Sequence, residues 1–237
     1  MQYHNPLATP DDVRGFVMEG PGAASFPDGR MRLRSTHKLA EGEHPQVSNI
    51  VFWCPEVFPD HVRISWEFRP REEPGLAILF FSAAGRNGGD LFDPRLAPRN
   101  GPYKQYHHGD INALHVSYFR RKAPSERAFH MCNLRKSHGF HMVAQGPDPI
   151  PSCVDATGPY RISLLKTGAL VRFSIGSPEI GHPEFTIFEW TDDGTAFGTV
   201  LGGGRIGFRQ MAPFVGEYAN LRVESVDLCE ETDERRG

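Results

Sequence analysis

The 237-residue sequence has little cysteine, no long apolar run and almost no net charge. Its four cysteines, Cys54, Cys132, Cys153 and Cys229, lie far apart without a CxxC pair. This spacing excludes a zinc ribbon, a thioredoxin-like site and a disulfide scaffold, so we expect free thiols. The longest apolar run, Leu76–Phe81, is far too short to span a bilayer. A formal net charge of −3 excludes the basic footprint of a general nucleic-acid binder.

Targeting signals are also missing from the beginning of the sequence. The first residues, MQYHNPLATPDD, contain no basic stretch followed by an apolar one, so nothing indicates secretion. We therefore expect a cytoplasmic protein with no membrane and no nucleic-acid partner. Its oligomeric state stays open between monomer and homodimer.

What the sequence has in quantity is turn formers, 25 glycines and 20 prolines without a fixed period. The segment 61–69, HVRISWEFR, alternates apolar and polar residues, which indicates a half-buried strand. The segment 76–83, LAILFFSA, has apolar residues on both faces, which indicates a central strand. Further strands are expected at 113–121, 128–136, 139–145, 160–168, 169–176, 184–190, 204–211 and 220–228, with hairpins at 166–168 and 192–194. Many short strands without a helical period predict an all-β sandwich or jelly roll. We expect one domain over 1–237, with a core at about 13–228 and short loose termini.

Three stretches carry a family resemblance. The segment 202–226, GGGRIGFRQMAPFVGEYANLRVESV, resembles the closing strands of concanavalin A-like lectin/glucanase jelly rolls. The segments YKQYHHGDINALHVSYFRR (103–121) and NLRKSHGFHMVAQGPDPIP (133–151) resemble the YesU-like bacterial family of unknown function. The resemblance implies a concanavalin A-like jelly-roll β-sandwich of two antiparallel sheets and a role in bacterial glycan degradation of plant cell walls. It implies no catalytic residues.

Polar and aromatic residues are concentrated between Tyr103 and Gln145, where six of the eleven histidines lie. Strand alternation places His115, Ser117 and Phe119 on one face. A face that mixes aromatic, imidazole, amide and guanidinium groups is typical of a carbohydrate-binding groove, here the concave face of the sandwich. The expected substrate-binding residues are Tyr103, Tyr106, His107, His108, Asn112, Asn133, Arg135, Lys136 and His141.

The same residue types suit β-elimination at a uronic acid, which needs a base, an acid and groups that stabilise an enolate-like charge. We predict His115 and Tyr118 as acid/base candidates, with the charge stabilised by Asn133, Arg135 and Lys136. His115 and Tyr118 differ in strand parity, so one of them is structural unless a bulge intervenes.

Hydrolysis is the other catalytic alternative, with Glu67 as its candidate. It would need a second carboxylate from another strand, because no paired acidic motif occurs. A lectin-like carbohydrate-binding module without catalysis is the alternative to an enzyme. The abundance of titratable groups favours an enzyme, either a lyase or a glycoside hydrolase.

No cofactor is expected to be required. The loop NGGDLFDP could supply Asp90 and Asp93 to a structural calcium ion. A transition-metal site built from histidines such as His107 and His108 would need HHGD to form a turn, because adjacent strand residues point to opposite faces.

Overall fold

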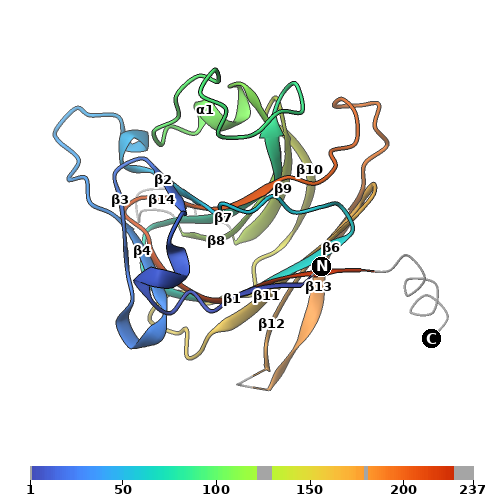
Figure 1. The fold of residues 1–237 in the computed structure, drawn as a ribbon. Helices are drawn as coiled ribbons and strands as arrows, with labels where there is room; N and C mark the ends of the chain where they lie inside the picture. The colour runs from blue at the N-terminus through green and yellow to red at the C-terminus, as the bar shows by residue number, and fades with distance from the viewer. Residues whose placement is uncertain (1, 122–129, 179–180, 227–237) are drawn as a thin grey trace.

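The computed structural model describes residues 2–121, 130–178 and 181–226. Within these residues, two antiparallel sheets pack face to face (Figure 1). The eight-stranded sheet has the order β13 (His182–Thr191), β12 (Leu170–Ser177), β11 (Tyr160–Thr167), β6 (Val62–Glu72), β15 (Val215–Ser225), β4 (Met31–Ser35) and β3 (Gly22–Ser25), and β1 (Gln2–Asn5) also pairs with β15. The seven-stranded sheet has the order β10 (His141–Pro147), β9 (Met131–Ser137), β8 (Ile111–Arg121), β7 (Gly75–Gly85), β14 (Arg205–Met211), β5 (Ile50–Trp53) and β2 (Val17–Glu19). The helical elements that lie wholly within the described residues are short, namely α1 (Lys104–His107) and the 3₁₀ helices Pro10–Val13, Pro27–Gly29 and Pro45–Ser48.

The prediction of a two-sheet, all-β jelly roll is confirmed. The expected hairpin at 166–168 is the turn between β11 and β12. The hairpin expected at 192–194 is wrong, because β13 and β14 lie in different sheets. The chain crosses from one sheet to the other there. The sequence patterns also missed β1 to β5, which have three to five residues each.

The main core lies between the two sheets and follows from strand alternation. In β6, Val62, Ile64, Trp66 and Phe68 are buried, while Glu67 faces the opposite way. Every second side chain of a strand points to the same face, so this apolar half of β6 packs against the other sheet. The polar half remains on the outer face of the eight-stranded sheet.

A second, smaller apolar cluster covers the outer face of the seven-stranded sheet. Trp53 of β5 and Phe80 of β7 lie under Tyr103 and Tyr106, which come from the segment 86–110. Figure 1 shows this segment, with α1, above the sheet. The segment 86–110 therefore packs onto the face that was predicted to hold the groove.

The cysteines agree with free thiols where they are described. Cys54 and Cys132 are buried, Cys153 is half-buried, and all three are unpaired. Cys229 lies outside the described residues, as do the first two residues of the strand predicted at 128–136 and the last two of the strand predicted at 220–228. Among the residues described, no helix combines the length and apolar character needed to cross a membrane.

Candidate functional site

His115 lies at the centre of a hydrogen-bonded chain on the outer face of the seven-stranded sheet. Ser137 donates through Oγ to the Gly139 carbonyl at 2.8 Å, so its oxygen accepts from His115 Nε2 at 3.0 Å. His115 Nδ1 then accepts from the Tyr103 hydroxyl at 2.6 Å. The imidazole is also stacked on Phe80. Burial, with the nearby Arg135 guanidinium, holds the pKa of His115 well below its ordinary value, so the ring is neutral and fully bonded.

Arg209 of β14 lies beneath the same segment. Its guanidinium contacts the rings of Tyr103 and Tyr106, with centroid distances of 4.4 and 5.0 Å, and donates to the Gly101 carbonyl at 2.8 Å. Two of its nitrogens have no hydrogen-bond partner among the described residues. Cation–π contact with these two rings offsets part of the cost of burying this charge.

Four imidazoles gather at the edge of this face, and we call His107, His108, His138 and His141 the histidine cluster. The ring of His108 lies 4.5 Å from that of His107 and 5.7 Å from that of His138, measured between centroids. The backbone explains the grouping, because α1 ends at His107 and the β9–β10 turn supplies His138. The Gly139 amide also donates to the His107 carbonyl, which joins the two segments.

Two exposed aromatic rings flank the histidine cluster. The Phe140 ring packs against His107 in a tilted arrangement, with 4.4 Å between centroids, and the Arg135 guanidinium lies 3.9 Å from its centroid. Phe197 stacks on His141 at 4.3 Å with an interplanar angle of 16°. Both phenylalanines are about 40% exposed, so part of each apolar ring is accessible to a ligand.

A hollow of about 310 Å³ opens beside the histidine cluster, and we call it the rim groove. It lies where the 192–203 loop approaches the ends of β8, β9 and β10. Its lining includes Arg86, Asn112, Lys136, His138, His141 and Phe197. The groove is therefore made by segments that are far apart in the sequence.

The electrostatic character of this region is positive. Arg86 and Arg135 make no ion pair with any residue that the structure describes. Burial and His108 lower the pKa of His107 to about 4, and burial and Arg86 lower the pKa of His138. These shifts follow from partial dehydration and from the neighbouring cations, which both disfavour another positive charge.

The structure separates the predicted acid/base residues. His115 and Ser117 lie on the outer face of the seven-stranded sheet, as strand parity predicts, and His115 contacts Tyr103 of the 86–110 segment. Tyr118 lies between the sheets, fully buried, and accepts a hydrogen bond from Trp66 Nε1 at 3.2 Å. Phe119 also enters the core, contrary to prediction, because the β7–β8 register shifts there and Phe119 has a φ of 49°. Tyr118 is thus structural, and the two candidates do not form one site.

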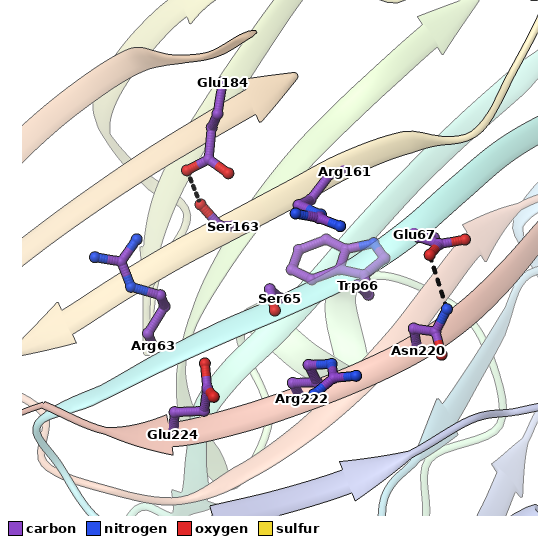
Figure 2. A pocket seen from close by; sticks show the side chains of 10 residues that line it. All are labelled: Arg63, Ser65, Trp66, Glu67, Arg161, Ser163, Glu184, Asn220, Arg222 and Glu224. Carbon is purple, nitrogen blue, oxygen red and sulfur yellow. Dashed lines mark hydrogen bonds between the residues drawn. The ribbon is translucent and has the colours of Figure 1, made fainter. Parts of the chain in front are cut away.

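Glu67 belongs to β6 and lies on the outer face of the eight-stranded sheet, away from His115. Figure 2 shows it among the residues that line a hollow there. Its carboxylate accepts from the Arg30 guanidinium and from Asn220 Nδ2, the latter at 2.7 Å. It therefore shares no site with His115. Glu184, which the sequence analysis did not select, lines the same hollow as Glu67.

Several predicted binding residues have structural partners. Lys136 faces inward and donates to Asp192 Oδ2 and the Gly198 carbonyl, both at 2.7 Å. Asn133 Oδ1 accepts from Gln145 at 2.7 Å, and Asn112 Oδ1 from the His138 amide at 3.2 Å.

The calcium ligands suggested by the sequence are bound to arginines. Asp90 pairs with Arg205, and Asp93 with Arg95, each at 2.6 Å. The described residues contain no group of three or more histidine, cysteine or acidic side chains placed to hold a metal ion.

Sequence reasoning missed Arg86, Phe140, Phe197 and Arg209. Strand parity could have placed Arg209 on the same face as Gly207. No local pattern could bring Phe197 to His141, because that contact depends on the path of the chain between the two sheets.

Comparison with known proteins places the chain among sandwich folds. Residues 1–223 match the family described as a domain of unknown function, DUF1961. The uncharacterized protein YesU of Bacillus subtilis (strain 168) is 52% identical over 221 residues, which cover 93% of this chain and 94% of YesU. A crystal structure from Bacillus subtilis, described as a protein of unknown function with a galectin-like fold, has a TM-score of 0.85 at 50% identity and 94% coverage of both chains. The resemblance to the YesU-like family is confirmed.

More distant structures share the fold alone. The exoplasmic/lumenal domain of VIP36, in its Ca²⁺/Man3GlcNAc-bound form, has a TM-score of 0.60 at 9% identity, covering 98% of this chain and 93% of that one. Lectin UEA-II complexed with galactose has a TM-score of 0.60 at 10% identity, covering 95% and 99%.

Proposed function

The chain belongs to the DUF1961 family, and we propose that it binds an anionic carbohydrate, such as a uronate-containing oligosaccharide, at the rim groove and the histidine cluster. The observation that carries the proposal is the pairing of two guanidiniums, Arg86 and Arg135, with two exposed rings, Phe140 and Phe197. Because these guanidiniums have no ion-pair partner among the described residues, a ligand carboxylate can bind them without displacing a protein acid.

The ligand class follows from the chemistry of these groups. Aromatic faces pack against the C–H surface of a sugar ring, and arginine binds carboxylates in a bidentate manner. The lectin-like neighbours support a carbohydrate, since VIP36 and lectin UEA-II are described with mannose-containing and galactose ligands.

The burial, hydrogen bonding and pKa values of the candidate acids and bases favour binding over catalysis. His115 is enclosed in its hydrogen-bonded chain, and Tyr118 lies between the sheets. A general base works best with a pKa near the working pH, whereas that of His107 is about 4.

β-Elimination is the second candidate, and one observation favours it. His107 is a neutral imidazole that packs against Phe140, and the Phe140 ring also contacts the Arg135 guanidinium. A base next to a cation that stabilises an enolate-like charge is the pair that this reaction needs.

Calorimetric titration with an oligogalacturonide and with its neutral galactan counterpart tests the proposal. We expect the acidic ligand to bind and Arg135→Ala to weaken it by about tenfold or more, since a hydrogen bond to a charged group is lost. Arg14→Ala, at an exposed site in another part of the chain, is the matched control. Equal affinity for the neutral ligand, or an unchanged affinity in Arg135→Ala, would refute the proposal. New ultraviolet absorbance of an unsaturated uronate during the same titration, absent from His107→Asn, would assign elimination to this site.

A further inference from the structure

The outer face of the eight-stranded sheet carries a second hollow, of about 410 Å³, on the side of the molecule away from the rim groove. We call it the arginine slot, because Arg63, Arg161 and Arg222 line it (Figure 2). Its lining side chains come from β6, β11, β13 and β15. A volume of this size lies within the range of small-molecule sites.

Two serines form the floor of the slot. Ser65 of β6 and Ser163 of β11 are opposite each other in the strand register, and Arg222 of β15 is opposite Ser65 on the other side. The two serine side chains are short and the arginines and glutamates around them are long, so a hollow remains above the serines. The floor is also held from below, because Trp66 packs in the core under β6.

The three arginines make no ion pair with any of the described residues, although acids are close. Arg161 is opposite Glu67 in the register, and Arg63 is opposite Glu224. Glu67 instead accepts from Arg30 and Asn220, and these bonds lower its pKa even though burial opposes the shift. The guanidiniums of the slot are therefore available to an external anion.

The carboxylates of the slot limit what that anion can be. Glu67, Glu184 and Glu224 all line it, and Glu184 accepts from Ser163 Oγ at 2.5 Å. A compact polyanion would be repelled by three acids, and an uncharged sugar would leave the guanidiniums without a partner. A ligand with one carboxylate and several hydroxyls satisfies both sets, because hydroxyls donate to carboxylates and arginine binds the acid.

We propose that the arginine slot is a second binding site, independent of the rim groove, for a sugar acid of one or two rings. The carboxylate of the ligand pairs with the guanidiniums of Arg161 and Arg222. Its hydroxyls donate to the acids at the edges of the slot, and one sugar face lies over the two serines.

Titration calorimetry with glucuronate, glucose and sulfate tests this site. We expect glucuronate to bind, and glucose and sulfate each to bind at least about tenfold more weakly. Glucose lacks the carboxylate that pairs with the arginines, and sulfate lacks the hydroxyls that donate to the acids. Arg161→Ala and Arg222→Ala should each lower the affinity for glucuronate by about tenfold or more. Ser65→Leu, which fills the floor, should abolish binding in a protein whose unfolding transition is retained. Arg34→Ala removes an exposed arginine of the same sheet outside the slot and should change nothing.

The result is distinguishable from that of the rim groove. Arg135→Ala should leave glucuronate binding at the slot unchanged while it weakens the oligosaccharide. No glucuronate binding, equal affinity for sulfate or glucose, or loss of glucuronate in Arg135→Ala but not in Arg161→Ala would overturn the proposal. None of these outcomes tests the proposed function of the rim groove, which depends on the oligogalacturonide titration alone.

Discussion

The ion pair between Lys136 and Asp192 joins the end of β9 to the 192–203 loop, and we predict that breaking it on one side destabilises the protein strongly. Lys136 Nζ lies 2.7 Å from Asp192 Oδ2, and the two side chains are only 2% and 5% exposed. Lys136→Met removes the cation and keeps a side chain of similar length. Asp192 would then be left as a buried carboxylate without its partner.

The size of the effect follows from this burial. Removing one member of a buried pair costs about 3–5 kcal/mol, because the remaining charge is neither hydrated nor paired. The Gly198 carbonyl loses its donor as well. With a urea dependence of about 2–3 kcal/mol per molar for a chain of this size, the unfolding midpoint should fall by about 1–2 M.

Urea unfolding followed by tryptophan fluorescence measures the shift. Lys136→Met/Asp192→Asn should recover most of the loss, because no unpaired charge remains. Arg14→Met removes one partner of an exposed pair, whose side chains are 81% and 82% exposed, and should be nearly neutral. A midpoint for Lys136→Met equal to that of the wild type would refute the reasoning.

Two further predictions concern protonation and packing. The folded state lowers the pKa of His107 from 6.5 to about 4, so its unfolded form binds a proton first as the pH falls, and stability should drop between pH 6.5 and 4.5. Urea midpoints of the wild type should show this slope and those of His107→Asn a shallower one; identical slopes would contradict the assignment. Gly207→Ala should cost about 1–3 kcal/mol, because its new Cβ would lie 2.4 Å from Trp53 Cε3. Gly202→Ala, where nothing lies within 4 Å, should unfold with the wild type in the same thermal scans, and equal losses in the two variants would rule out the steric cause.

Strand alternation predicted much of what lies on each face of the sheets. It placed His115 and Ser117 on one face of β8, and the structure sets them opposite Arg135 and Asn133 of β9 in the strand register. It failed at Phe119, where a register shift and a positive φ turn the side chain into the core. A bulge of this kind depends on the partner strand and leaves no mark in a single strand's pattern.

Contacts that depend on the path of the chain could not be predicted. The 192–194 turn resembled a hairpin, but the following strand joins the other sheet, and this crossing brings Phe197 to His141 and Asp192 to Lys136. Likewise, Glu67 and Glu184 share a hollow only because β6 and β13 belong to the same sheet. Sequence spacing carries no information on either juxtaposition.

The position of β15 has a consequence for the order of folding. It comes after every strand it pairs with, yet it lies inside the sheet, between β6 on one side and β4 and β1 on the other. Until β15 is synthesised, β6 keeps an unpaired edge and an incompletely covered apolar face. The eight-stranded sheet therefore cannot be completed before β15 has been made. A nascent chain that stops short of β15 lacks an interior strand rather than an edge, and we expect such truncations to aggregate.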